Sequence, residues 1–66
     1  MKIYKKLLSE IYSNESILRL FLSKEEIKAC NKMIKLGYIY KGKRDEKNAT
    51  TSYYITKEGE NYLEQN

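Results

Sequence analysis

Four lysines and one asparagine recur through residues 24–35 at a spacing that places them on one side of a helix. They are Lys24, Lys28, Asn31, Lys32 and Lys35. Lysine neutralises phosphate oxygens, and the asparagine carboxamide matches the paired donor and acceptor of adenine in the DNA major groove. This face therefore predicts phosphate contacts and one base-reading side chain, Asn31. The alternative for each lysine is a solvated position that keeps the helix soluble.

A second basic group lies within residues 41–48, where Gly42 and a run of polar residues predict the mobile tip of a hairpin. Its cations are Lys41, Lys43, Arg44 and Lys47. A basic tip can follow phosphates or enter the minor groove, and Arg44 suits insertion best because guanidinium is less strongly hydrated than ammonium. Asp45 and Glu46 weaken this interpretation, and an exposed loop end of mixed charge is the alternative.

Catalytic chemistry has little support in the sequence. The chain has no histidine to act as a base near neutral pH and no glycine-rich phosphate loop. Its one cysteine, Cys30, falls among apolar positions, where a small core residue is expected rather than a nucleophile. Glu25 and Glu26 are adjacent and point to different sides of a helix. We therefore expect no enzyme, no metal site and no cofactor.

The charge distribution favours a polyanionic partner. Residues 1–22 hold four basic and two acidic residues, and residues 23–44 hold seven basic and two acidic residues. Residues 45–66 hold two basic and five acidic residues. The formal net charge of +4 is thus concentrated in the middle third of the chain, where both basic groups begin. Phosphate binding requires such a concentration, because each cation that neutralises a phosphate releases condensed counterions.

The elements that must position these groups follow from apolar spacing and capping residues. In a single domain over residues 1–66, we expect an amphipathic helix at residues 2–13 and a short buried helix, or alternatively a strand, at residues 17–22. A third helix is predicted over residues 24–36. Its signals are the capping box of Ser23 and Glu26 at the start and Gly37 at the end.

Aromatic and β-branched residues then predict two strands, over residues 38–40 and 51–56, and a last helix over residues 57–65 capped by Thr56. Tyr53 is expected to point inward, in phase with Ile55. Three other tyrosines alternate to the opposite sheet face, where they could stack on unpaired bases or belong to a protein interface: Tyr38, Tyr40 and Tyr54.

This order of elements resembles the winged helix-turn-helix. Residues 33–39 look like the end of that family's recognition helix running into its first wing strand, and residues 53–59 are similar to the second wing strand of MarR-like and PadR-like regulators. Together with residues 23–30, the resemblance covers about residues 14–63. It implies an α+β winged helix-turn-helix fold, with three helices followed by a two-stranded wing and a short C-terminal helix.

The resemblance also implies a function. We expect a transcriptional regulator, or an accessory replication or recombination factor, that reads double-stranded DNA with residues 24–36 and a basic wing at residues 41–48. The chain lacks the long flanking helices of larger regulators, so no small-molecule effector is expected, and a minimal module from a phage, plasmid or other mobile element is favoured. The alternatives are an adaptor or inhibitor that binds a host protein, and a single-stranded DNA binder that uses the tyrosine-rich sheet face.

The sequence also leads to expectations about assembly and location. A homodimer through the terminal helices is expected, with Tyr4 and Tyr12 flanking the apolar stripe of the first helix and Tyr62 and Leu63 on the last. The longest apolar runs are far shorter than a membrane span, and no apolar signal peptide is recognised. A cytoplasmic protein without membrane contact is therefore expected.

Overall fold

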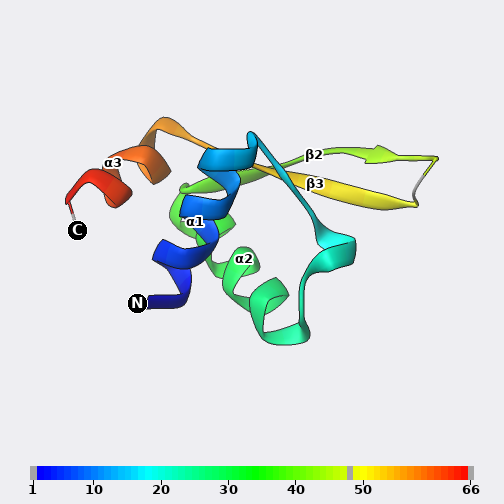
Figure 1. The fold of residues 1–66 in the computed structure, drawn as a ribbon, viewed down its shortest axis with the longest axis horizontal. Helices are drawn as coiled ribbons and strands as arrows, with labels where there is room; N and C mark the ends of the chain where they lie inside the picture. Colours follow the sequence, from blue (N-terminus) through cyan, green and yellow to red (C-terminus); the bar gives the residue numbers. More distant parts are fainter. Residues whose placement is uncertain (1, 48, 66) are drawn as a thin grey trace.

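Three α-helices and a three-stranded antiparallel sheet make up the part of the chain that the structure describes, residues 2–47 and 49–65 (Figure 1). The structure is a computed structural model. Its elements in chain order are helix α1 (Lys2–Asn14), strand β1 (Ile17–Leu18), 3-10 helix η1 (Arg19–Phe21), helix α2 (Lys24–Leu36), strands β2 (Ile39–Asp45) and β3 (Thr50–Ile55), and helix α3 (Lys57–Gln65). The α+β class expected from the sequence is confirmed.

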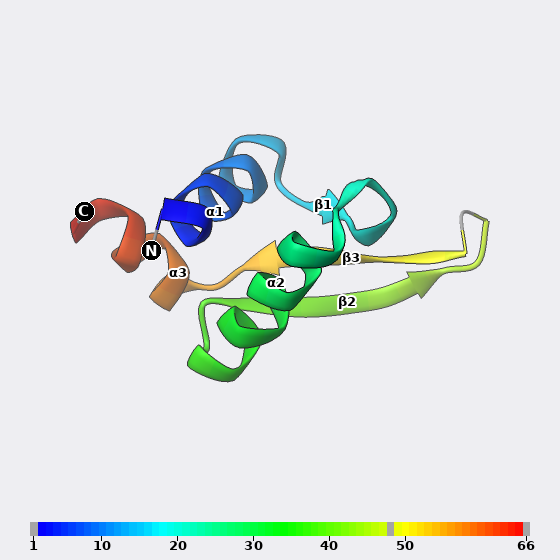
Figure 2. The same ribbon diagram turned by 90° about the horizontal axis from the view of Figure 1, so that it is seen from below.

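The sheet has one strand more than the predicted two-stranded wing. Its order is β1-β3-β2, so that β3 lies in the middle and pairs with both neighbours in antiparallel fashion. In the β2–β3 hairpin, Tyr40 lies opposite Tyr54 and Arg44 opposite Thr51, with a register shift between Lys41 and Arg44. The hairpin extends beyond the helices along the long axis of the molecule (Figures 1 and 2).

The hydrophobic core joins α1, α2 and the inner face of the hairpin. Its nine buried side chains are Tyr4, Leu7, Leu8, Ile11, Ala29, Cys30, Met33, Ile39 and Tyr53. The inward position of Tyr53 and the core position of Cys30 confirm the sequence predictions. The prediction that Tyr4 flanks the apolar stripe of the first helix and belongs to a dimer surface is wrong. Its side chain is only 8% exposed and fills the core.

The short buried helix expected at residues 17–22 is not formed, whereas the alternative expectation of a strand holds for Ile17 and Leu18. Ile17 and Leu18 pair with β3, and a single 3-10 turn follows, closed by the Leu22 N–H donating to the Arg19 carbonyl at 3.0 Å. Leu20 is 63% exposed and Phe21 73% exposed. Six residues give too few hydrogen bonds to offset the cost of nucleating an α-helix, whereas β3 offers a ready edge for pairing.

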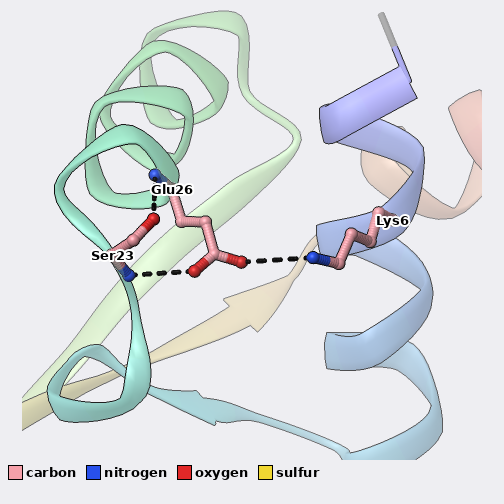
Figure 3. Close-up of polar contacts among 3 residues, drawn as sticks. All are labelled: Lys6, Ser23 and Glu26. Atoms are coloured by element: carbon pink, nitrogen blue, oxygen red, sulfur yellow. Dashed lines mark hydrogen bonds and ion pairs between the residues drawn. The ribbon is translucent and has the colours of Figure 1, made fainter.

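Helix α2 is fixed at both ends as the sequence predicts. The Ser23 Oγ accepts from the Glu26 N–H at 3.2 Å and the Ser23 N–H donates to Glu26 Oε1 at 2.9 Å (Figure 3). The other Glu26 oxygen lies 3.6 Å from Lys6 Nζ on α1, so one carboxylate caps α2 and links the two helices. At the far end, Gly37 adopts the left-handed conformation (φ 82°) and its N–H donates to the Ile34 carbonyl.

Replacing Glu26 by glutamine should remove a pH-dependent part of the stability. Chiefly the Ser23 backbone N–H, with help from Lys6, holds the pKa of Glu26 below its ordinary value of 4.5. Because the folded-state pKa is depressed, the stabilisation by the carboxylate is complete above about pH 4.5 and is lost as the pH falls through the lowered pKa.

Glutamine still accepts from the Ser23 N–H but carries no charge. Thermal melts should therefore show the unsubstituted protein to be the more stable at pH 7, with the difference from Glu26→Gln closing in acid. A difference that stays constant with pH would contradict this role of the charge.

Helix α3 is fastened to the start of the hairpin. Thr56 caps it as predicted, with its Oγ1 accepting from the Gly59 N–H at 3.1 Å, while the Thr56 N–H donates to the Tyr38 carbonyl at 2.9 Å. The ring of Tyr62 packs on that of Tyr38, with centroids 4.8 Å apart. These contacts hold α3 beside α1 at the end of the molecule opposite the hairpin tip (Figure 1).

Candidate nucleic-acid interface

The side of α2 that faces away from the core carries all the basic residues predicted for it. The four lysines and the asparagine of the predicted set are all exposed: Lys24, Lys28, Asn31, Lys32 and Lys35. The opposite side of the same helix buries Ala29, Cys30 and Met33. Figure 2 shows α2 lying across the sheet on the side toward the viewer. The structure thus brings these five residues together on one uncovered helix.

The charge of this face is available to a partner. Glu26 is paired with Lys6 of α1, and within the described residues no carboxylate is seen paired with a lysine of α2. Glu26 is turned toward Ser23 and α1 rather than toward these lysines. Glu25 is also exposed and lines a depression with Lys28 and Lys32, so this side of α2 carries four lysines and one carboxylate. A net excess of cations is what an incoming phosphate backbone requires.

The second predicted group lies on the hairpin, where all four cations are exposed: Lys41, Lys43, Arg44 and Lys47. Lys41 lies opposite Tyr53, close to the core, whereas Arg44 lies opposite Thr51, on the half of the hairpin that extends beyond the helices. The group is therefore spread along the hairpin and separate from α2. Of the predicted wing at residues 41–48, residue 48 lies outside the described residues.

The tyrosine-rich face is smaller than the sequence predicts. Tyr40 and Tyr54 are cross-strand partners whose rings stack with centroids 5.3 Å apart, and Tyr40 is 52% exposed. Tyr38 does not join them, because it precedes β2, packs beside the core and contacts the ring of Tyr62. Gly42 belongs to this face as well, since any Cβ at this position would overlap the ring of Tyr54. That contact was not predicted from the sequence.

Two buried groups lie behind the basic face. Cys30 is fully buried, and this burial raises the pKa of its thiol to about 11, so the thiol stays protonated at neutral pH. Tyr53 is also fully buried, its Oη has no hydrogen-bond partner among the described residues, and burial raises the pKa of the phenol. Both groups belong to the core that supports α2, and neither is open to a reactant.

Within residues 2–47 and 49–65, no set of three or more His, Cys, Asp or Glu side chains could hold a metal ion. None of the helices in this part of the chain has the length and apolar character needed to cross a membrane.

Comparisons with family models, with curated proteins and with solved structures gave no match to this chain. The two basic groups, on α2 and on the hairpin, are therefore the features of this chain that bear on its function.

Proposed function

We propose that the chain is a small winged-helix protein that binds duplex DNA, as a transcriptional regulator or an accessory replication or recombination factor. One observation carries the proposal: four lysines and one asparagine, residue types that suit phosphates and base edges, are exposed on one side of α2, whose other side is core. The basic hairpin beside it supplies the wing.

The dimensions of α2 suit the major groove. Thirteen residues give a helix about 20 Å long, and the groove, about 12 Å wide, admits one helix. Lys28 and Lys32 then bind phosphates, while Asn31 between them reaches the edge of an adenine. The hairpin follows the adjacent backbone, where Arg44 enters the narrow minor groove.

The segment before α2 departs from the winged-helix pattern. In that family a helix precedes the recognition helix, whereas here η1 is a single turn. Other contacts hold α2 in its place: the ion pair of Lys6 with Glu26 on one side and the burial of Cys30 and Met33 on the other. A helix supported in this way is rigid enough to be presented to a groove.

Binding to duplex DNA should weaken steeply with salt. If six or more phosphates are contacted, log K should fall linearly with log salt, by about a thousandfold between about 50 and 200 mM. Fluorescence anisotropy with a labelled duplex measures this slope. An absence of binding at low salt, or an affinity indifferent to salt, would reject the proposal.

Single-stranded DNA is the second candidate, because the stacked Tyr40 and Tyr54 rings offer a platform for unpaired bases. The same assay separates the two ligands by competition. Unlabelled oligo-dT should compete less well than unlabelled duplex if α2 carries binding. If oligo-dT competes better than duplex, and if Tyr40→Ala removes this advantage, binding would be assigned to the tyrosine face instead.

We also propose a homodimer through the terminal helices. Tyr12 on α1 is 59% exposed and lines a depression together with Leu63 and two glutamates of α3, Glu60 and Glu64. This surface is distant from the hairpin tip, so pairing there leaves both basic groups uncovered and can set two copies of α2 one DNA turn apart, about 34 Å.

Analytical ultracentrifugation at tens of micromolar tests the dimer. The expected result is a species of twice the 7.9 kDa monomer mass that reverts to monomer in Tyr12→Glu, since this change places a carboxylate beside Glu60 and Glu64. A monomer of 7.9 kDa both with and without DNA would refute the dimer.

A further inference from the structure

Leu20 and Phe21 are the two most exposed large hydrophobic side chains among the described residues, at 63% and 73%. They are neighbours in the 3-10 turn η1, and both side chains are exposed to solvent. Sequence patterning predicts a buried segment here, and the structure places it outside the core.

The Leu20–Phe21 pair is held on a rigid support. The Leu20 N–H donates to Thr50 Oγ1 on β3 at 3.1 Å, and Thr50 is itself buried. On the other side, Leu22 packs against the core and its N–H closes the turn onto Arg19. Because both flanks are anchored, the backbone that carries the pair is held against β3 and the core.

Its surroundings are basic on both sides. Arg19 and Lys24 flank the pair in sequence and are exposed. Thr50, which accepts from the Leu20 N–H, lies opposite Asp45, and the next residue, Thr51, lies opposite Arg44, so η1 lies beside the outer half of the hairpin. Figure 2 shows η1 between the start of α2 and the hairpin. The pair thus lies between the two basic groups.

These charges select among the possible partners of the pair. In a twofold contact between two copies, Arg19 and Lys24 of one would approach the same residues of the other, and like charges disfavour such pairing. A polyanion with apolar groups beneath its charges matches the surface instead. Duplex DNA has that structure, with stacked bases between two lines of phosphates.

We propose that Leu20 and Phe21 form an apolar wedge that inserts between base pairs from the minor groove and kinks the duplex. The proposal rests on the proposed function, because α2 in the major groove and the hairpin on the adjacent minor groove bring η1 to that groove's edge. Wedges of Phe and Leu in other proteins unstack a base step and bend DNA by about 20–90°. Pyrimidine–purine steps such as TA kink most easily and are the expected sites.

The experiment measures DNA bending separately from binding. A duplex of about 30 base pairs with central TA steps and a donor and acceptor dye at its ends should show increased energy transfer when saturated with protein. The double variant Leu20→Ala/Phe21→Ala should bind about tenfold more weakly, keep the same salt slope because no charge is removed, and leave energy transfer at the free-duplex value. Leu36→Ala, which truncates an equally exposed leucine at the other end of α2, should bend DNA normally.

A second variant reports on the wedge directly. The chain has no tryptophan, so Phe21→Trp introduces a single indole whose fluorescence should be quenched by base stacking when DNA is added. Normal bending by the double variant, or indole fluorescence unchanged in the complex, would overturn the wedge while leaving DNA binding in place. A blue shift with rising protein concentration alone would make the pair a protein interface and overturn it too. Failure of the unsubstituted protein to bind duplex would instead remove the proposed function.

Discussion

Gly59→Ala is expected to destabilise the domain by about 2–4 kcal/mol, a large fraction of the stability of so small a protein. Gly59 is buried in the first turn of α3. A Cβ there would overlap the backbone carbonyl of Tyr38 and lie 2.8 Å from Ile55 Cγ1. The carbonyl cannot move aside cheaply, because it accepts from the Thr56 N–H at 2.9 Å. Urea denaturation followed by circular dichroism measures the loss.

The sign of this effect makes the test decisive. In an open helix, glycine to alanine stabilises by up to about 1 kcal/mol, so a stabilised Gly59→Ala would disprove the close approach of α3 to Tyr38. Gly42→Ala is the matched control. Its Cβ would overlap only the ring of Tyr54, a side chain on a half-exposed sheet face that can turn away, and the expected cost is below about 1.5 kcal/mol.

Removing two cations from α2 should weaken DNA binding more than any other pair of alanine substitutions. Lys28→Ala/Lys32→Ala should lower affinity about ten- to a hundredfold at low salt, for all duplex sequences alike, and should reduce the salt slope by about two. Both side chains are exposed and unpaired with carboxylates, so the melting temperature should stay near its original value.

Two variants complete this series. Lys57→Ala removes an exposed cation from α3, away from the proposed interface, and should leave the affinity almost unchanged. Asn31→Ala should alter sequence preference by about 1–3 kcal/mol at one base pair with little effect on the salt slope. An equal loss of affinity in Lys57→Ala and in the Lys28/Lys32 variant would indicate attraction by overall charge rather than by α2.

The parts of the fold that were predictable from sequence are those determined by neighbours along the chain. The capping box of Ser23 and Glu26 and the left-handed Gly37 depend on residues a few positions apart, and both define α2 as expected. With its ends and its buried stripe known, the exposed positions of α2 follow from helical geometry alone. For this reason the exposure of Lys28 and Asn31 could be predicted before the fold was known.

The sequence predictions fail at residues whose conformation is determined by a contact with a residue far away in the sequence. Residues 17–22 read as a buried helix because Ile17 and Leu18 are apolar, but their pairing partner in β3 is far away in sequence. Tyr38 has the spacing of an exposed sheet residue, yet α3 returns to place Tyr62 against it. In both cases a local pattern is overridden by a tertiary contact that the pattern does not contain.

The central place of β3 in the sheet also constrains the order in which the chain can fold. Ile17 pairs with Tyr53, which is far away in the sequence, so the β1–β3 pairing closes a long loop. The helices α1 and α2 and the hairpin form from contacts that are closer in sequence. During synthesis on the ribosome, β1 has no partner until nearly the whole chain has emerged. Residues 17–22 therefore become ordered only after β3 is available, and the Leu20–Thr50 hydrogen bond then anchors the turn.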